Sequence, residues 1–311
     1  MSAKRSICFC INNNYVKHCC ITISSIVNHN PYLFDFHIIS SDLTTESKEL
    51  LTKVVGASSI SFHSIDISTF QKCKLTIDHT TIETYFRYLI PELLPQLDRV
   101  LYLDVDIIVQ GDISELFKID LKDYYVAGVI DTFIESQHYK ATINYPESAP
   151  YINAGVLLLN LKKIRSDNIY NTLIDNTIKL QDSIKFQDQD IINLTFSPSI
   201  KPIDKKYNYT SHLFLNNEKF LTESAIIVHY TGVFKPWTTK ITSHPPILLY
   251  YNAVAKSPFA TLSLKISVLK YAIKRLFFSK TKLSKNTFEI SVLGFRLLRT
   301  RKASSVLDEH Q

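Results

Sequence analysis

Short apolar runs rich in β-branched residues alternate with amphipathic stretches from the start of the chain to about residue 200. Such runs, when polar residues bound them, are typical of buried strands, and apolar positions recurring every three or four residues are typical of helices. The pattern predicts strands over residues 6–11, 36–40, 59–65, 100–103, 125–130 and 155–160, and helices over residues 16–28, 45–55, 84–94, 167–180 and 188–195.

Strands that alternate with helices predict an α/β fold with a mostly parallel sheet covered by helices on both faces. Thr44 and Thr45, followed by Glu46 and Glu49, predict the start of the second helix, and Thr45 and Glu49 are close to capping-box spacing. We expect a further strand over residues 225–230, a further helix over 247–255, and a long functional cover over 130–152. Because ligands of such sheets bind at the carboxyl ends of the strands, the residues that follow each apolar run are the first functional candidates.

The chain changes character at Lys256. Residues 262–278 place apolar side chains at helical spacing with lysines and an arginine between them, which predicts a basic amphipathic helix. Residues 256–311 carry 12 Lys and Arg against 3 acidic residues, whereas residues 1–255 have a small net negative charge. The sequence therefore divides into a main domain, 1–255, and a basic amphipathic C-terminal tail, 256–311.

Composition excludes two kinds of phosphate site. The chain has 6 glycines, and no two of them form the G-x-G of a dinucleotide-binding loop or the pattern of a P-loop. Phosphate binding would therefore need cations, a metal ion or helix N-termini. The 5 cysteines lack zinc-ligand spacing and predict reduced thiols in a cytoplasmic protein. No apolar run reaches the roughly 18 residues of a membrane-spanning helix, and the first run is too short for a signal peptide.

Asp104 and Asp106 directly follow the apolar run at residues 100–103. Two residues apart on an extended chain, their side chains point to the same side. Because two neighbouring carboxylates repel each other, the pair predicts a divalent cation with oxygen ligands. Two solvated loop aspartates are the alternative interpretation, since this short pattern is common.

A second candidate group follows the strand expected over residues 225–230 and contains His229, Gly232 and Lys235. An imidazole added to two carboxylates is a ligand mixture that suits Mn²⁺. Lys235 would bind a phosphate as a point charge, and Gly232 would let the backbone approach the ligand closely. For His229 alone, a histidine satisfied within the core is the alternative.

Two more polar motifs, residues 151–155 and 186–190, complete the set, since clusters of amides and carboxylates can bind sugar hydroxyls. Together, VLYLDVDIIV, NAGVLLLNLK, QDQDIIN and HYTGVFKPW resemble the motifs of glycosyltransferase family 8. This family includes bacterial lipopolysaccharide galactosyl- and glucosyltransferases and glycogenin. The resemblance extends from Ile7 to about Trp237 and is strongest to the lipopolysaccharide α-galactosyltransferases.

The resemblance implies a nucleotide-sugar-binding fold of the GT-A type in residues 1–255, a UDP-sugar donor, and Mn²⁺ with Mg²⁺ as the alternative ion. The implied metal ligands are Asp104, Asp106 and His229. The implied donor-binding residues are Asn12, Asn14, Tyr15, Arg87, Asp104, Val105, Asp106, Asn153, Ala154, Asp188, Gln189, Gly232 and Lys235. Asn12 stands where the family often has aspartate, and its side-chain carbonyl is expected to accept a hydrogen bond from the uracil N3–H.

The family retains the anomeric configuration of the transferred sugar. A two-step route would need a carboxylate nucleophile, and the matching position is Gln189, whose amide is a poor nucleophile. The resemblance therefore favours front-face attack by the acceptor hydroxyl, with Gln189 stabilising an oxocarbenium-like centre and Asp188 as the alternative nucleophile. The candidates for acceptor contacts, by position, are His79, Asp131, Phe186 and Gln187.

We therefore expect a Mn²⁺-dependent, retaining transferase that moves galactose or glucose from a UDP-sugar to a lipid-linked glycan such as lipopolysaccharide. It would act at the inner face of the cytoplasmic membrane, with the tail bound to the anionic surface or, alternatively, packed on the main domain. No nucleic-acid-binding module is visible. The competing hypotheses are a catalytically silent sugar-nucleotide-binding or scaffold protein, and a nucleotidyltransferase, which would need a glycine-rich basic loop that this sequence lacks.

Overall fold

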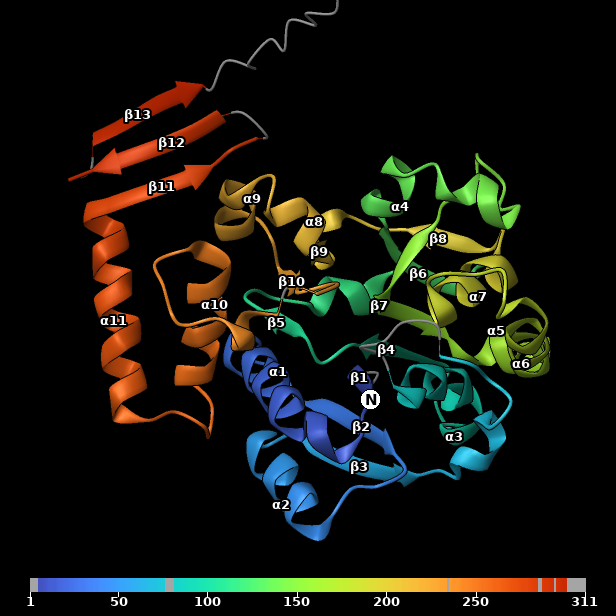
Figure 1. Ribbon diagram of the computed structural model, residues 1–311. Coiled ribbons are helices and arrows are strands. Elements are labelled where there is room, and N and C mark those ends of the chain that lie inside the picture. The colour runs from blue at the N-terminus through green and yellow to red at the C-terminus, as the bar shows by residue number, and fades with distance from the viewer. Residues whose placement is uncertain (1–4, 76–80, 234, 285–286, 294, 301–311) are drawn as a thin grey trace, which may run out of the picture.

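The computed structural model describes residues 5–75, 81–233, 235–284, 287–293 and 295–300. The strands of its central sheet are β1 (Arg5–Cys10), β2 (Phe34–Ser40), β3 (Ser59–Ser64), β4 (Arg99–Leu103), β6 (Val126–Ile130), β7 (Ile152–Asn160) and β8 (Ile200–Pro202). They lie in the order β3-β2-β1-β4-β7-β6-β8 (Figure 1). Strand β7 is antiparallel to β4 and β6, and the other neighbours are parallel. The predicted α/β fold with a mostly parallel sheet is confirmed.

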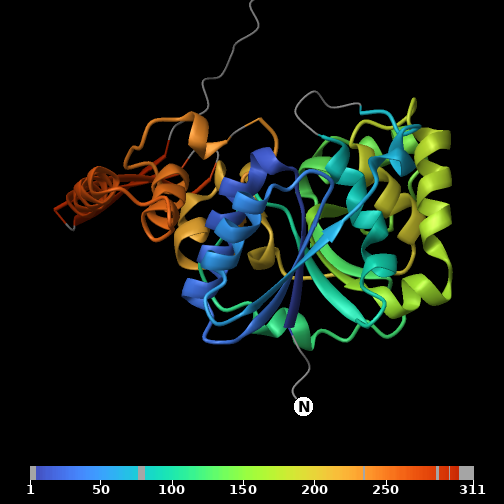
Figure 2. The ribbon, with the colours of Figure 1, turned by 90° about the horizontal axis from the view of Figure 1, so that it is seen from below.

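Helices cover both faces of the central sheet (Figure 2). One face carries α1 (Val16–His29) and α2 (Thr45–Val54), and the other carries the 3₁₀-helix η3 (Ile82–Leu89), α3 (Ile90–Leu93), α5 (Leu161–Ser166), α6 (Ile169–Leu180) and α7 (Gln187–Phe196). Alternate residues of β1 enter different cores, because successive strand side chains point to opposite faces. Ile7 and Phe9 pack in the core under α1, whereas Cys8 packs in the core under η3.

A small second sheet brings a distant segment beside the end of β4. Its strands are β5 (Ile107–Val109), β10 (Ile227–His229) and β9 (Tyr209–Thr210), in the order β5-β10-β9. Since β5 starts just after the turn that follows β4, its pairing with β10 places His229 next to that turn. The remaining short helices are η1 (Asn13–Tyr15), η2 (Ile67–Phe70), η4 (Ser114–Lys118), α4 (Thr132–Ser136), η5 (Tyr139–Ile143), η6 (Lys205–Tyr207), α8 (Ser211–Phe214), α9 (Glu218–Glu223) and η7 (Pro236–Thr238).

The C-terminal part of the described chain forms its own layer at one end of the molecule (Figure 1). It consists of α10 (Pro245–Ala255), α11 (Leu262–Phe277) and an antiparallel sheet of β11 (Phe278–Lys282), β12 (Thr287–Val292) and β13 (Phe295–Thr300). Helix α11 lies against α10 and buries Val268. The basic helix expected over 262–278 is therefore present, whereas the three strands were not predicted.

Two local expectations differ from the structure. The helix expected over 84–94 is instead η3 followed by α3, because Pro91 has no N–H to continue an α-helical ladder. The N-cap of α2 is Thr44 rather than Thr45, since the Thr44 hydroxyl accepts from the Ser47 N–H at 3.2 Å. The segment expected to form a cover, residues 130–152, contains the short helices α4 and η5.

Candidate active site

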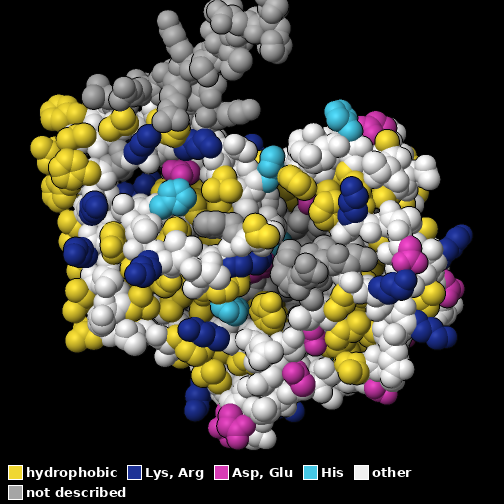
Figure 3. All heavy atoms as spheres, viewed as in Figure 1, with side chains coloured by type: hydrophobic (Ala, Val, Ile, Leu, Met, Phe, Trp, Pro, Cys, Tyr) yellow, Lys and Arg dark blue, Asp and Glu magenta, His cyan; other side chains and the backbone are white. Residues whose placement is uncertain are grey.

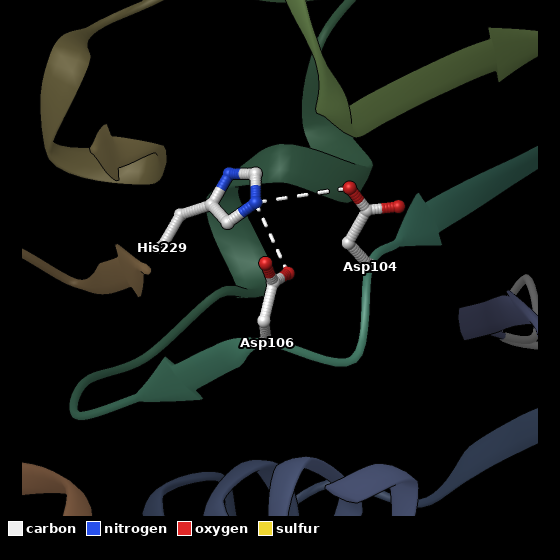
Figure 4. A group of neighbouring side chains, drawn as sticks. All are labelled: Asp104, Asp106 and His229. Carbon is white, nitrogen blue, oxygen red and sulfur yellow. Dashed lines mark ion pairs between the residues drawn. The ribbon is translucent and has the colours of Figure 1, made fainter. Parts of the chain in front are cut away.

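Asp104, Asp106 and His229 converge on one point, as predicted (Figure 4). The His229 Nε2 atom lies 3.1 Å from Asp106 Oδ1 and 3.7 Å from Asp104 Oδ2. The Asp104 N–H donates to the Gly155 carbonyl at 2.8 Å, and the Tyr230 N–H donates to the Asp106 carbonyl at 2.9 Å. These backbone bonds fix the turn between β4 and β5 against β7 and β10, so the three side chains face one another.

A chain of hydrogen bonds sets the tautomer of His229. The Asn153 Nδ2 group donates to the Asp131 carboxylate at 3.1 Å, which leaves Asn153 Oδ1 as the acceptor of the Asn208 Nδ2 group at 2.8 Å. The Asn208 Oδ1 atom then lies 2.9 Å from His229 Nδ1, which must carry the hydrogen. The Nε2 lone pair of the neutral ring is thereby directed at the two carboxylates. Three acceptors that face one point need a cation between them, and the residues fit a bound divalent ion.

Lys235 supplies a cation on the other side of Asp106. Its Nζ atom lies 2.5 Å from Asp106 Oδ2 and 2.7 Å from the Tyr230 carbonyl oxygen. Burial raises the pKa of the Asp106 carboxyl, but the Lys235 ammonium opposes burial, and the net effect holds that pKa well below its usual value. Asp106 is therefore an anion in the folded protein, as a metal ligand must be.

Arg87 connects the first aspartate to the residues around α7. Its guanidinium is buried and lies 3.2 Å from Asp104 Oδ1 and 3.1 Å from Asp188 Oδ2. It also donates to the Ala154 carbonyl at 2.7 Å. Asp188 accepts a further bond from the Thr84 hydroxyl at 2.5 Å. Burial raises the pKa of the Asp188 carboxyl, and Arg87 opposes that rise. Asp188 Oδ1 is therefore hydrogen-bonded, whereas Oδ2 lies in an ion pair with Arg87 but has no hydrogen-bond donor among the residues that the structure describes.

Gln189 belongs to the same network through its amide. Its Oε1 atom accepts from Asn153 Nδ2 at 3.0 Å and from the Ala154 N–H at 3.1 Å, and its Nε2 group donates to Asp131 at 3.2 Å. Asp131 also caps α4. The structure therefore joins the predicted donor residues Asn153, Ala154 and Gln189 to the predicted acceptor residue Asp131.

The first predicted motif lies at the carboxyl end of β1, beside β4. Asn12 caps η1 by accepting from the Asn14 N–H at 3.1 Å, and its amide donates to Glu83 at 3.2 Å. Tyr15 is half-buried at the end of η1, and the Val105 carbonyl accepts from the Thr22 hydroxyl. Gly232 has a φ of +69° with open space around its α-carbon, so its backbone is accessible to a ligand.

The acceptor candidates are not all brought together. Asp131 joins the network described above, and Phe186 packs edge-on against Tyr139 with ring centroids 5.0 Å apart. Gln187 is only 1% exposed, at the start of α7, so its side chain faces the interior. His79 lies outside the described residues.

Sequence reasoning missed several residues of this site. Their side chains form hydrogen bonds with predicted site residues or with residues next to these. They are Glu83, Thr84, Tyr102, Asp190 and Asn208. Tyr102, for example, donates to Asp104 at 2.6 Å, and Tyr151 donates to the buried Asp190 at 2.5 Å. The available signal was position, since Asn208 immediately precedes a strand and Thr84 precedes Arg87 by one helical turn.

Comparison with known proteins identifies this sheet and its acidic cluster as the fold of a glycosyltransferase. The crystal structure of the galactosyltransferase LgtC with donor and acceptor sugar analogues superposes with a TM-score of 0.74 at 25% identity, covering 84% of this chain and 99% of LgtC. The profile of glycosyl transferase family 8 matches residues 6–240. The chain belongs to this family.

Two curated relatives agree with that assignment. A putative glycosyltransferase of Haemophilus influenzae is 31% identical over 247 residues, which cover 77% of this chain and 74% of the relative. A lipopolysaccharide 1,2-glucosyltransferase of Escherichia coli is 30% identical over 281 residues, which cover 85% of this chain and 82% of the relative.

Proposed function

We propose that this protein transfers galactose or glucose from a UDP-sugar to a lipid-linked saccharide, with retention of configuration and with Mn²⁺ as its metal ion. The observation that carries the proposal is the cluster of Asp104, Asp106 and His229 beside Lys235 and Arg87. Two carboxylates and one imidazole suit Mn²⁺, and Mg²⁺ is the alternative. The relatives named as lipopolysaccharide glucosyltransferase and galactosyltransferase support the choice of sugar and of acceptor class.

The leaving group of this reaction, UDP, is the part that most needs stabilisation. Breaking the bond between the sugar and UDP builds negative charge on the diphosphate. A divalent ion held by Asp104, Asp106 and His229 would neutralise part of that charge. Lys235 can also stabilise this negative charge. Its ammonium lies at the Asp106 carboxylate and can bind a phosphate oxygen of the donor instead.

Retention by front-face attack agrees with the state of the two candidate nucleophiles. Asp188 is buried and ion-paired with Arg87, and its Oδ1 atom accepts from Thr84, so attack by Asp188 on the sugar would have to give up the ion pair. The Gln189 carbonyl already accepts from Asn153 and from the Ala154 N–H, but as a neutral dipole it can stabilise positive charge at the anomeric carbon without losing these bonds. We therefore assign this stabilising role to Gln189, and Gln189→Ala should lower kcat strongly with little change in KM. Nearly full activity of that variant would refute the assignment.

The acceptor is assigned to the side of the site that Asp131 and Phe186 occupy. Asp131 reaches Gln189 and Asn153, and the ring of Phe133 next to Asp131 is exposed and packs edge-on against Phe186. An exposed aromatic ring beside a carboxylate is suited to a saccharide, since sugars present both apolar faces and hydroxyl donors. His79 and Gln187 remain sequence-based candidates for the same role.

We assign membrane binding to the C-terminal layer. Helix α11 exposes a row of large apolar side chains, and lysines lie between them: Leu262, Ile266, Leu269, Ile273, Leu276, Lys265, Lys270 and Lys274. Figure 3 shows apolar side chains with basic ones among them along this edge. No helix of the described residues is long and apolar enough to cross a membrane. An exposed basic amphipathic helix binds the surface of an anionic membrane, here the inner face of the cytoplasmic membrane.

Flotation with anionic liposomes tests this assignment in the full-length chain. Replacing the exposed Ile266 and Leu269 by Gln should release the protein from vesicles that contain anionic lipid, while UDP-sugar hydrolysis stays unchanged. The matched control replaces the exposed Leu33, on the main domain, by Gln and should still float. Equal flotation of all three proteins would show that α11 does not bind the membrane.

A further inference from the structure

Glu83 is a buried carboxylate at the edge of the candidate active site, and the reaction proposed above does not use it. The residue is 8% exposed. Among the residues that the structure describes, no Lys, Arg or His forms an ion pair with it. Removing a carboxylate from water is costly unless hydrogen-bond donors replace the lost solvation. Glu83 therefore needs donors, and a ligand can supply one.

The partner of Glu83 has a fixed orientation. The Asn12 Oδ1 atom accepts from the Asn14 N–H, and the Asn12 Nδ2 group donates to Glu83 Oε2 at 3.2 Å. A backbone N–H can only donate and an ionised carboxylate can only accept, so the amide cannot be turned over. Asn12 keeps one amide hydrogen that this pair does not use, and Glu83 keeps lone pairs. The two side chains together offer an acceptor beside a donor.

The pair lies at the carboxyl end of β1, beside the strand that leads to the metal-binding cluster. Asn12 follows β1, which pairs in parallel with β4, the strand that leads to Asp104. Glu83 lies on η3, the same short helix that carries Arg87 to Asp104 and Asp188. One helix therefore reaches both the metal-binding cluster and Asn12, where the resemblance to family 8 implies the uridine site.

We propose that Glu83 selects the base of the donor by accepting a hydrogen bond from the uracil N3–H. Asn12 assists by donating its remaining amide hydrogen to the adjacent carbonyl O4. This inference rests on the UDP-sugar donor proposed above. It also replaces the expectation that the Asn12 carbonyl binds N3–H, because that carbonyl already caps η1. Cytosine is rejected, since it presents a lone pair at N3 to the carboxylate and an amino group to the Asn12 donor.

Binding of UDP and of CDP, each with Mn²⁺, to the full-length protein tests the role of Glu83 without any acceptor. Calorimetric titration gives both dissociation constants. Glu83→Gln keeps the shape, removes the charge and offers a donor to cytosine N3. We expect UDP to bind about tenfold more weakly and CDP no more weakly than to the wild type, so the preference for UDP shrinks. The double variant Asn12→Asp, Glu83→Gln again places a carboxylate beside the base and should restore the preference for UDP over CDP.

Matched controls separate base selection from damage to the fold. Glu92→Gln removes an exposed carboxylate from the neighbouring helix α3 and should leave the preference unchanged. Should Glu83→Gln fail to fold by circular dichroism, Glu83→Asp keeps the charge and should bind UDP more weakly yet still prefer it to CDP; equal binding of the two would contradict the proposal.

The outcomes distinguish this inference from the function on which it rests. An unchanged preference in Glu83→Gln, or an equal loss of UDP and CDP binding, overturns the role of Glu83 while the UDP-sugar donor stands. A wild-type protein that binds neither UDP nor CDP removes the proposed function and this inference with it.

Discussion

Gly155 is the position where a single added methyl group should damage the metal site without removing any ligand. It lies in β7, and its carbonyl accepts from the Asp104 N–H. A Cβ atom added there would lie 2.8 Å from Asp104 Oδ2 and 2.8 Å from His229 Nδ1. Ordinary contacts begin near 3.4 Å. Gly155→Ala must therefore displace the imidazole and the carboxylate by about 0.6 Å or more.

That displacement exceeds what a metal site tolerates, because ligand distances are held within about 0.2 Å. We expect Gly155→Ala to weaken Mn²⁺ binding by about tenfold to a hundredfold, the range found when the supports of metal ligands are lost. Overpacking should also cost about 1–3 kcal/mol of unfolding free energy, which a domain of ordinary stability survives. The affinity is measured by Mn²⁺ titration followed by electron paramagnetic resonance, and the fold by thermal denaturation.

The control for this experiment is Gly111→Ala. Gly111 lies beyond β5, and a Cβ there would lie 3.4 Å from the flexible Ile226 side chain, an ordinary contact. This variant should bind Mn²⁺ like the wild type. A folded Gly155→Ala protein with wild-type Mn²⁺ affinity would refute the packing argument and, with it, the assignment of Asp104 and His229 as metal ligands.

Three further predictions concern the same region. Asn208→Ala should lower Mn²⁺ affinity about tenfold or more, because His229 loses the acceptor that fixes its tautomer, and the titration used for Gly155→Ala measures it. Lys235→Ala should lower kcat for UDP-sugar hydrolysis by a larger factor than it lowers Mn²⁺ affinity. A loss of kcat no larger than the loss of Mn²⁺ affinity would show that Lys235 supports the metal ligands and does not bind the diphosphate. Burial, with Lys17, lowers the pKa of His18 from 6.5 to about 4. Between pH 6.5 and 4, His18 is therefore protonated in the unfolded chain but neutral in the folded protein. The free energy of unfolding should fall as the pH is lowered from 6.5 to 4. Denaturant melts should show a smaller fall in His18→Gln.

The candidate metal ligands could be predicted from the sequence, but the residues that hold them in place by hydrogen bonds could not. Asp104 and Asp106 were predictable from their place after an apolar strand. The resemblance to family 8 added His229, which reaches them only because β10 pairs with β5. Asn208 was not predictable, since an asparagine in a polar stretch carries no local signal and acquires its role only when β9 pairs with β10. Glu83 was missed for the same reason, because its contact with Asn12 joins residues 71 positions apart.

The same limit applies to the fold. Strong periodicity predicted the strands of the central sheet except β8, and the helices on both faces. The split between η3 and α3 depends on Pro91 within a short apolar stretch. The strands β11, β12 and β13 escaped prediction, since basic and apolar residues follow one another there without a clear period. Tertiary pairing rather than local pattern determines such strands.

Release of UDP from UDP-galactose and UDP-glucose by the full-length protein tests the central claim most directly. With Mn²⁺ we expect UDP to form from at least one of the two donors, and we expect EDTA to abolish the reaction and added Mn²⁺ to restore it. Asp106→Asn should lose this activity while keeping its thermal stability within a few degrees. No release from any UDP-sugar, or equal release with EDTA, would contradict a metal-dependent glycosyltransferase.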